Sequence, residues 1–377
     1  MVAGEASGDL LGGHLIAALK AKRPGLQFSG IGGPKMQEQG FETYFPMEKL
    51  SVRGYVEVLR HYREIMRIRR RLAARLLEEP PTLFVGVDAP DFNLDLARHL
   101  KQAGIPAIQY VGPTIWAWRA WRLRRIARSV THVLALFPFE PPLYEKAGVP
   151  VTYVGHPLAD VIPLHVAKAE ARTQLRLPAN KLVIALLPGS RRSELEYMAE
   201  VFVKTARRFY EEVKDVHFVC PTASRSTRDM FEASLRHHAG MELPLTLLFG
   251  HSHEALAAAD LALVASGTAS LEAALFKIPM IITYKMSPVT WLLMRRMLYM
   301  PYVGLPNILA GEFLVPEFIQ DKANAAALAA ALMDLLHDAP RRRRQIERFH
   351  EIHATLRQNT AEKAAIAVLG VLDRARA

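Results

Sequence analysis

The chain has 377 residues, which is enough for two domains, and half of the residues are apolar, so each domain can bury a core. This composition excludes a disordered or fibrous protein, and a single cysteine, Cys220, excludes an intrachain disulfide and a cysteine-rich zinc site. Lys and Arg outnumber Asp and Glu by 48 to 37, and the net charge of +11 predicts an anionic partner: nucleic acid, an anionic membrane surface or a phosphorylated substrate.

Short, continuously apolar runs alternate with helical segments along the chain. Such runs are typical of parallel strands that helices cover on both faces. In chain order, the predicted strands span residues 83–87, 107–111, 132–137, 151–154, 182–187, 217–220, 245–249, 261–265 and 280–284. The earlier runs predict one doubly wound α/β domain, those from 182 to 284 predict a second, and residues 155–163 are typical of a linker. We expect the carboxyl ends of both sheets to line a cleft, where open α/β folds bind ligands.

Two glycine-rich turns open the first predicted domain, at residues 4–9 (GEASGD) and 30–36 (GIGGPKM). Neither is a dinucleotide fingerprint or a Walker sequence, but both suit loops that let a bulky ligand approach the backbone. Only Met1, Val2 and Ala3 precede the first turn, fewer than the about 5–6 residues of an ordinary strand, so we expect the chain to begin inside its first strand.

A candidate general base follows the predicted strand 83–87. Asp88 begins the sequence DAPDFN (residues 88–93) and would lie at the carboxyl end of the strand, where catalytic groups gather in α/β sheets. A hydrogen-bonded turn residue is the alternative for Asp88, and Asp91 is a candidate N-cap of the helix that follows.

Several segments are unusual in composition. Residues 59–77 predict a very basic helix that also carries apolar side chains. Residues 116–125 interleave Trp and Arg, which suits single-stranded nucleic acid, a membrane interface or a partly buried helix. Residues 291–302 are rich in large apolar and aromatic side chains, and four arginines at 341–344 lead into a last helix. No apolar run approaches the about 20 residues of a membrane-spanning helix and no secretory signal opens the chain, which predicts a soluble or peripheral, cytoplasmic protein.

Residues 187–191 (LPGSR) follow a predicted strand in the second domain and open a helix. Gly189 lets the turn run close to a ligand, the helix amino end presents N–H groups, and Arg191 can grip a phosphate with two hydrogen bonds. Ser193 and Glu196 have the spacing of a capping box. A capped helix with a solvated arginine is the alternative.

Residues 265–272 (ASGTASLE) repeat this arrangement of strand, turn and helix. Glu272 follows Thr268 by four residues and therefore lies one helical turn deeper on the same face, where its carboxylate can accept hydrogen bonds from two ribose hydroxyls. A surface glutamate is the alternative for Glu272 alone. Together, the two helix ends and the carboxylate resemble a pocket for a nucleoside diphosphate.

An ordered set of motifs resembles the bacterial lipid-A-disaccharide synthase family from residue 4 to about residue 320. The matching stretches are residues 4–9 (GEASGD), 30–36 (GIGGPKM), 88–93 (DAPDFN), 116–118 (WAW), 155–157 (GHP), 187–191 (LPGSR), 267–272 (GTASLE) and 306–320 (PNILAGEFLVPEFIQ). The resemblance implies a GT-B glycosyltransferase with two Rossmann-like domains facing an interdomain cleft. Residues 1–158 would bind the acceptor and 159–340 the UDP-sugar, and the helical segment 341–377 would pack back on the first domain or on a partner chain.

The resemblance also implies an inverting, metal-independent reaction without a cofactor. The donor would be UDP-2,3-diacylglucosamine and the acceptor 2,3-diacylglucosamine 1-phosphate (lipid X). The products would be UDP and the β(1→6)-linked disaccharide 1-phosphate, a precursor of lipid A in the lipopolysaccharide of Gram-negative bacteria.

The resemblance assigns roles residue by residue. Asp88 would deprotonate the acceptor hydroxyl. The donor UDP would be bound by Gly189, Ser190, Arg191, Ser266, Gly267, Thr268, Glu272, Asn307 and Glu312. The acceptor side of the cleft would be lined by Glu5, Ser7, Asp9, Arg53 and His156. Arg53 departs from the family pattern because it replaces an apolar residue, which leaves open a changed acyl preference or a grip on the acceptor phosphate.

We expect an enzyme peripherally bound to the cytoplasmic face of the inner membrane, using the basic helix 59–77 and the segment 291–302. A homodimer is left open, and no nucleic acid is expected as a partner because no nucleic-acid-binding module is present. A UDP-sugar 2-epimerase is the alternative enzyme. A nucleic-acid-binding protein that uses the positive charge is the alternative from another class.

Overall fold

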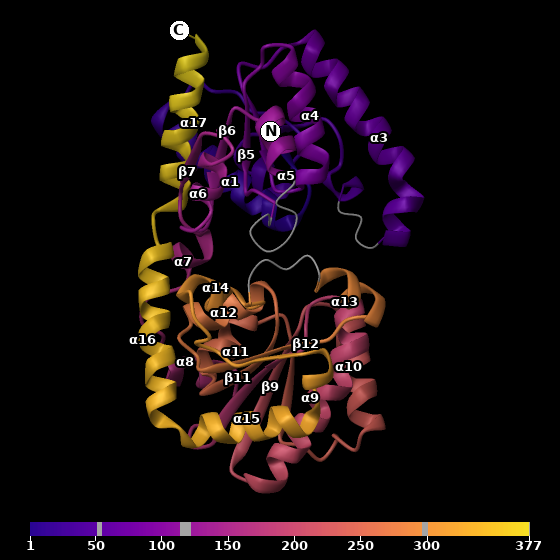
Figure 1. Cartoon of the computed structure of the whole chain (residues 1–377), viewed down its shortest axis with the longest axis vertical. Helices are drawn as coiled ribbons and strands as arrows, with labels where there is room; N and C mark the ends of the chain where they lie inside the picture. The colour runs from indigo at the N-terminus through magenta and orange to yellow at the C-terminus, as the bar shows by residue number, and fades with distance from the viewer. Residues whose placement is uncertain (51–54, 114–121, 296–300, 377) are drawn as a thin grey trace. The chain divides into compact units, whose positions relative to one another are not determined.

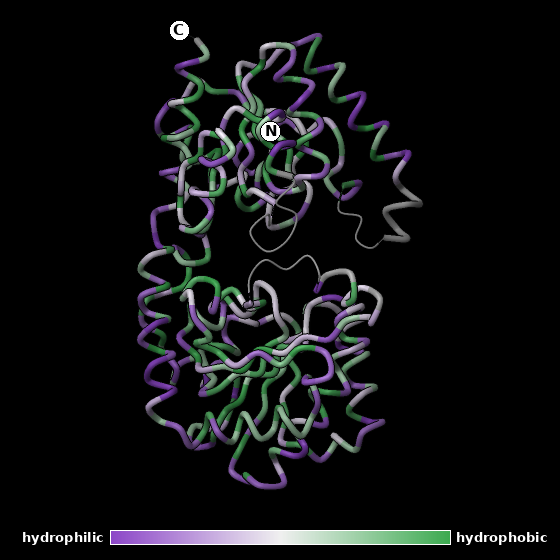
Figure 2. The backbone as a smooth tube through the Cα atoms, in the orientation of Figure 1, coloured by the Kyte–Doolittle hydropathy of each residue, from purple (hydrophilic) through white to green (hydrophobic). Residues whose placement is uncertain are grey.

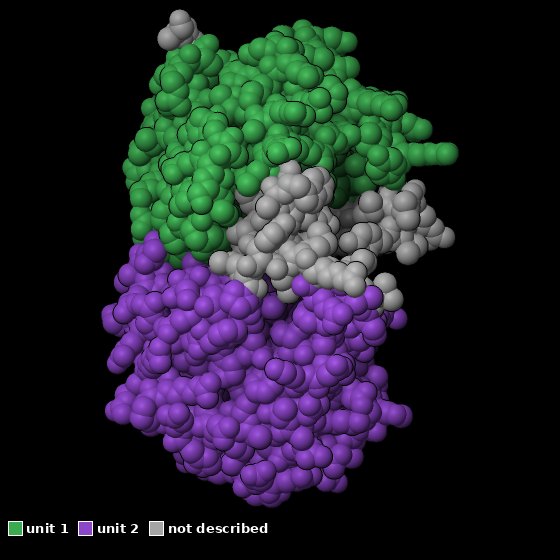
Figure 3. Space-filling model, in the orientation of Figure 1, with its two compact units in different colours: residues 1–160, 356–377 green, residues 161–355 purple. Residues whose placement is uncertain are grey.

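The computed structural model describes residues 1–50, 55–113, 122–295 and 301–376. The chain divides into two compact units, shown in Figure 3: unit 1 comprises Met1–Asp160 and Leu356–Ala377, and unit 2 comprises Val161–Thr355. The chain therefore passes between the units twice, after Asp160 and after Thr355.

Unit 1 is built on a parallel sheet with the strand order β1-β4-β5-β6-β7. Figure 1 labels β5, β6 and β7 of this sheet. Its strands are β1 (Val2–Ala3), β4 (Phe84–Val87), β5 (Ala107–Tyr110), β6 (His132–Ala135) and β7 (Val151–Tyr153). Its helices are α1 (Ala6–Lys22), α2 (Pro34–Gln37), α3 (Tyr55–Glu78), α4 (Pro90–Gln102), α5 (Arg122–Ser129), α6 (Pro141–Glu145), α7 (Pro157–Val161) and α17 (Thr360–Arg376), with a 3-10 turn at Met47–Lys49. Helix α1 packs on α17, and α4 contacts both α3 and α5. A separate parallel pair joins β2 (Ser29–Gly30) to β3 (Glu42–Thr43).

Unit 2 contains a second parallel sheet, with the order β10-β9-β8-β11-β12-β13. Its strands are β8 (Leu182–Leu187), β9 (Val216–Thr222), β10 (Leu245–Phe249), β11 (Leu261–Ala265), β12 (Met280–Tyr284) and β13 (Glu317–Ile319). Its helices are α8 (Lys168–Gln174), α9 (Arg192–Glu212), α10 (Arg225–His237), α11 (Ser252–Ala258), α12 (Thr268–Leu275), α13 (Pro288–Met294), α14 (Leu305–Ala310), α15 (Ala325–His337) and α16 (Ala339–Leu356), with a 3-10 turn at Gln320–Lys322. Helix α9 packs against α10 and α15, whereas α11 contacts α8 and α12.

The apolar runs are strands in both units, as predicted, because both faces of each sheet are covered. All residues of β4, β5, β6 and β11 are buried. Figure 2 shows that hydrophobic residues gather in the central strands of unit 2 and that hydrophilic residues mark its outer helices. Fully buried aromatic side chains such as Tyr110 and Phe202 each contribute about 1.5–3 kcal/mol by leaving water.

The basic segment 59–77 is helical, as predicted, and lies within α3. Its buried residues recur every four positions, at Ile68, Leu72 and Leu76, because that spacing aligns them on one helix face. Arg63, Arg67 and the other exposed positions lie around them. The helix is therefore amphipathic, with arginine on its solvent side.

The prediction for the carboxyl-terminal helices was wrong in one respect. The arginines at 341–344 lie inside α16 and do not precede a last helix. The last helix is α17, and Asp160 caps it by accepting the backbone N–H groups of Asn359 (3.0 Å) and Thr360 (2.7 Å). The break before α17 contains neither Gly nor Pro, and its left-handed residue is Asn359 (φ +54°), so the sequence carries only a weak stop signal.

Candidate active site

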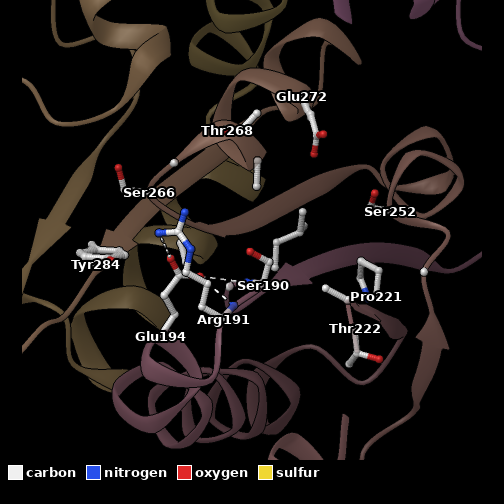
Figure 4. Close-up of a pocket in the computed structure, with 17 residues that line it drawn as sticks. Ser190, Arg191, Glu194, Pro221, Thr222, Ser252, Ser266, Thr268, Glu272 and Tyr284 are labelled. Atoms are coloured by element: carbon white, nitrogen blue, oxygen red, sulfur yellow. Dashed lines mark hydrogen bonds and ion pairs between the residues drawn. The ribbon is translucent and has the colours of Figure 1, made fainter. Parts of the chain in front are cut away.

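The carboxyl ends of parallel strands in unit 2 open onto one cavity of about 430 Å³ (Figure 4). The loops that follow β8, β9, β10 and β11 contribute to its wall, as does Tyr284 at the end of β12, because strands that run in parallel end at the same edge of a sheet. The polar and charged side chains that line the cavity are Ser190, Arg191, Glu194, Thr222, Ser252, Ser266, Thr268, Glu272 and Tyr284. The cavity lies within the size range of ligand pockets.

The turn after β8 is tied to the helix that follows it by Glu194. Its Oε2 accepts the backbone N–H groups of Ser190 (2.9 Å) and Arg191 (3.2 Å). Arg191 is the N-cap residue of α9, and Glu194, at the third helical position, accepts its backbone N–H. The predicted pair Ser193 and Glu196 was therefore wrong, because the helix begins two residues earlier than that spacing assumed.

Glu194 also decides what the amino end of α9 can offer an anion. We expected these N–H groups to be free for a ligand. Those of Ser190 and Arg191 instead already donate to the Glu194 carboxylate. The Arg191 guanidinium remains: its side chain is 60% exposed and its Nη1 lies 3.6 Å from Glu194 Oε1. An anion at this end would therefore meet the arginine side chain first.

Gly189 is required by this turn for two reasons. Its φ is +122°, which side chains rarely adopt, and a Cβ would lie 2.6 Å from Glu194 Oε2. We expect Gly189→Ala to lower the affinity for UDP at least tenfold, because the turn must move Arg191 to relieve the clash. Gly104→Ala is the matched control: its φ is +84°, but no atom lies within 4 Å of the added Cβ. Isothermal titration of both variants checks this, and equal affinities would refute it.

The turn after β11 leads into α12 through Gly267, whose φ is +144°. The backbone N–H of Ser266 donates to Thr283 O (3.0 Å), which fixes the turn to β12. Thr268 and Glu272, one helical turn apart, both line the cavity. The structure thus brings together Gly189, Ser190, Arg191, Ser266, Gly267, Thr268 and Glu272 around one pocket.

Asn307 and Glu312 do not line this pocket and have other partners. Asn307 is buried, and its Nδ2 donates to Val315 O (2.8 Å) and to Glu317 Oε1 (2.7 Å) while its Oδ1 accepts the Val315 N–H (2.7 Å). Glu312 pairs with Arg344 of α16. Both residues hold the loop 301–317 in shape. In this structure both residues therefore make scaffolding contacts.

Sequence reasoning missed the wall made by the loops after β9 and β10. Thr222, Gly250 and Ser252 line the pocket there, and Thr222 Oγ1 donates to Leu248 O (2.8 Å), which ties the two strands together. The sequence did indicate this position, because all three residues lie within three positions after a predicted strand, 217–220 or 245–249, at the same sheet edge as Arg191 and Thr268.

Asp88 in unit 1 directly follows β4, and its backbone is left-handed, with φ +57° followed by +40° at Ala89. Such conformations cost about 1–3 kcal/mol each and persist only where neighbours enforce them. Here the Asp88 carbonyl accepts hydrogen bonds from Asn93 Nδ2 (2.8 Å) and Gln109 Nε2 (3.0 Å). Both amides are buried, and sequence reasoning gave neither a role.

The first glycine-rich turn meets Asp88 because β1 pairs with β4 in parallel, with Ala3 opposite Val87. Ser7 Oγ donates to Asp88 Oδ2 at 3.5 Å, and Glu5 is the N-cap residue of α1. A Cβ at Gly4 would lie 2.6 Å from that of Ala89. The glycine therefore permits the close approach of α1 to the candidate base.

Asp9 lies on the same helix but is buried and anchors the second glycine-rich turn. Its carboxylate accepts the backbone N–H groups of Gly33 (2.9 Å), Lys35 (2.9 Å) and Met36 (3.0 Å). These contacts bind the two glycine-rich motifs to each other. The structure thus gives Asp9 a scaffolding contact.

His156 follows β7 and is buried, with its ring 5.4 Å from that of Phe137 and its Nδ1 accepting the Leu158 N–H (3.3 Å). Burial lowers the pKa of His156 to about 4. Nearby, burial raises the pKa of Glu140 to about 7, although its Oε2 accepts the N–H groups of Leu136 (3.0 Å) and Phe137 (2.9 Å). Both groups are therefore neutral in the folded protein between these two pKa values.

These two shifts act oppositely on stability. Below the unfolded His pKa of about 6.5, the unfolded state binds a proton that buried His156 does not bind, so stability falls as the pH falls. Between pH 7 and about 4.5, folded Glu140 binds a proton that the unfolded state lacks, so stability rises as pH falls.

We expect Glu140→Gln to expose the effect of His156, a loss of about 1 kcal/mol in the free energy of unfolding for each pH unit below pH 6.5. Urea titrations at pH 5, 6 and 7 check this, with His156→Gln giving the opposite slope. Parallel curves for wild type and both variants would contradict it.

The predictions for Arg53 and for residues 116–118 lie outside the described residues, as do residues 296–300 of the predicted apolar segment. Across the described ranges, no helix is long and apolar enough to cross a membrane.

Comparison with known proteins gives one consistent result. A family model described as lipid-A-disaccharide synthetase matches residues 1–371. Lipid-A-disaccharide synthase of Dechloromonas aromatica is 58% identical over 374 residues, 99% of this chain and 98% of that protein. The same enzyme of Methylobacillus flagellatus is 53% identical over 372 residues, with the same coverage of both chains.

Solved structures share the fold at low identity. A UDP-GlcNAc 2-epimerase from Neisseria meningitidis bound to UDP-GlcNAc has a TM-score of 0.61 at 11% identity and covers 98% of this chain and 97% of that chain. Anabaena HepE in complex with UDP and glucose has a TM-score of 0.59 at 16% identity and covers 98% of both chains. The chain therefore has the GT-B fold of two Rossmann-like halves, as predicted.

Proposed function

The chain belongs to the lipid-A-disaccharide synthetase family, and from this we propose which of its residues carry the reaction. Its activity is that of a UDP-sugar-dependent glycosyltransferase that forms the lipid A disaccharide. The observation that carries the assignment of the site is the convergence of Arg191 and Glu272 on one pocket at the carboxyl edge of unit 2.

The donor would be UDP-2,3-diacylglucosamine, with its UDP in this pocket. Arg191 would bind the diphosphate, and the N–H groups at the start of α12, from Gly267 and Thr268, would help to hold it. Ser190 and Ser266 offer hydroxyl groups in the wall of the same pocket, and Gly189 would let the turn after β8 approach the diphosphate closely. Glu272 would accept hydrogen bonds from the ribose hydroxyls. Asn307 and Glu312 would act indirectly, through the loop that they hold.

Charge development explains why an arginine is needed. As the bond between the anomeric carbon and the phosphate oxygen breaks, the electron pair leaves with UDP, and negative charge grows on the leaving phosphate. A guanidinium fixed beside that oxygen stabilises the transition state more than the ground state. Arg191 is tethered by Glu194 but is exposed, so it can form this contact without leaving its turn.

The acceptor would be 2,3-diacylglucosamine 1-phosphate, with Asp88 as the general base. Asp88 would take the proton of the 6-hydroxyl as that oxygen attacks the anomeric carbon from the side opposite UDP. A single displacement of this kind inverts the anomeric configuration and needs no covalent intermediate. Glu5, Ser7, Arg53 and His156 would contribute to the acceptor side, and Asp9 would act through the glycine-rich turns that it joins.

Both substrates carry acyl chains, so we propose a peripheral association with the cytoplasmic face of the inner membrane. The arginines on the solvent side of α3 support it, together with exposed apolar side chains such as Tyr62 (53% exposed) and Leu292 (45% exposed). Sedimentation with vesicles containing anionic lipid, compared with neutral vesicles, tests this part. Equal, weak sedimentation with both would overturn it.

The function is tested by measuring UDP release in detergent, with EDTA present and with either or both lipids. Release that requires both lipids supports a metal-independent transferase. Release with the donor alone would point to hydrolysis or to an epimerase-like elimination and would overturn the proposed acceptor. Release that stops in EDTA and returns with a divalent cation would overturn metal independence.

A further inference from the structure

The carboxylate proposed to hold the ribose is accompanied by a histidine that lies outside the lining of the pocket. His253 is in α11 and Glu272 in α12, and His253 Nε2 lies 3.6 Å from Glu272 Oε1. This is an ion-pair distance, slightly longer than a hydrogen bond. The Glu272 side chain is only 20% exposed, so its charge is poorly hydrated and a cation nearby stabilises it.

The position of His253 is set by protein packing. Its ring contacts that of Phe276, with centroids 5.3 Å apart and an angle of 56° between the ring planes. Phe276 follows Glu272 by four residues, so both side chains extend from α12 toward α11. The contact with Glu272 raises the pKa of His253, although partial burial opposes the shift.

The ion pair engages one oxygen of Glu272, while Glu272 also lines the pocket together with Thr268 and Ser252, the first residues of α12 and α11 (Figure 4). A flexible glutamate side chain would have to be ordered when a ligand binds, at a cost in affinity. A glutamate already held through Oε1 has less freedom to lose, and its second oxygen, Oε2, would accept the hydrogen bonds of the ligand.

We propose that His253 is a positioning residue that orients Glu272 and thereby sets selectivity for a nucleotide with an intact 2′,3′-diol. This inference rests on the proposed ribose-binding role of Glu272. It predicts that His253 affects recognition of the sugar of the nucleotide and leaves recognition of the diphosphate unchanged.

The test compares the affinities of the full chain for UDP and for 2′,3′-dideoxy-UDP by isothermal titration. The ratio of the two dissociation constants measures diol selectivity. A purely structural defect would weaken the binding of both ligands and leave this ratio unchanged. We expect wild type to prefer UDP about tenfold or more. His253→Ala should reduce that preference three- to tenfold, and Glu272→Gln should nearly abolish it. His253→Gln should retain it within about twofold, because the glutamine amide can place a donor where Nε2 lies.

Arg191→Ala is the matched control for the ratio. It should lower the affinities for both ligands equally, because both contain the diphosphate. His253→Asn, which is too short to reach Glu272, replaces His253→Ala if that variant fails to fold. A wild-type ratio in folded His253→Ala or His253→Asn, together with a loss of the ratio in Glu272→Gln, would overturn the inference alone. An unchanged ratio in Glu272→Gln would overturn the ribose assignment and the inference with it.

Discussion

Asp88→Asn is expected to lower kcat by about 10²–10⁴-fold, the usual contribution of a general base, while the dissociation constant for UDP stays unchanged. The substitution keeps the size of the side chain and its ability to receive a hydrogen bond from Ser7, but it removes the basic oxygen. Asparagine also tolerates the left-handed backbone at this position, φ +57°, better than most residues. Loss of turnover would therefore report lost chemistry, with the fold maintained.

Asp91→Asn is the control for the same motif. Asp91 lies in the first turn of α4 and is exposed, three residues after Asp88. The control should retain near-normal turnover with both lipids. Turnover of Asp88→Asn within about threefold of wild type would remove Asp88 as the base. Circular dichroism and UDP titration on the same samples separate a lost base from a lost fold.

The strands were predictable because a buried parallel strand appears in the sequence as a short, continuous run of apolar residues. In a parallel sheet both faces are covered, so a strand such as β11, Leu261–Ala265, is apolar at every position. By contrast, β13 (Glu317–Ile319) is short and half-buried, and no apolar run marks it. The carboxyl edge of each sheet follows from strand direction, which is why the sequence alone placed Asp88, Arg191 and Thr268 at those edges.

Contacts between residues distant in sequence were not predictable. The roles of Asn93 and Gln109 depend on their amides meeting at the Asp88 carbonyl, from a helix and from a neighbouring strand. Asn307 matches a family motif, yet its amide is bound to Val315 and Glu317, which only the folded loop reveals. The spacing of residues in the sequence shows which residue types lie at a turn. The hydrogen-bond partner of each polar atom depends on how the folded chain packs.

The amino end of α9 illustrates the same limit and leads to a further prediction. Sequence reasoning expected free N–H groups there, but Glu194 accepts those of Ser190 and Arg191. The Arg191 side chain is therefore the main cationic group that this turn offers to a diphosphate, so a single substitution should remove most of its contribution. We expect Arg191→Ala to raise the dissociation constant for UDP by about 10–100-fold, the range of one or two charge-assisted hydrogen bonds.

The dependence on ligand charge distinguishes this role from a general loss of structure. The loss of affinity should be largest for UDP, smaller for UMP and absent for uridine, because in the proposed role Arg191 would contact phosphate alone. Arg191→Lys should recover part of the affinity, since it restores the charge without the two-pronged geometry. The neighbouring Arg192→Ala is the matched control: Arg192 is 73% exposed, pairs with Glu196 at 3.5 Å and does not line the pocket. If Arg192→Ala weakened UDP as much as Arg191→Ala, the effect would be one of net charge, and the specific contact would be refuted.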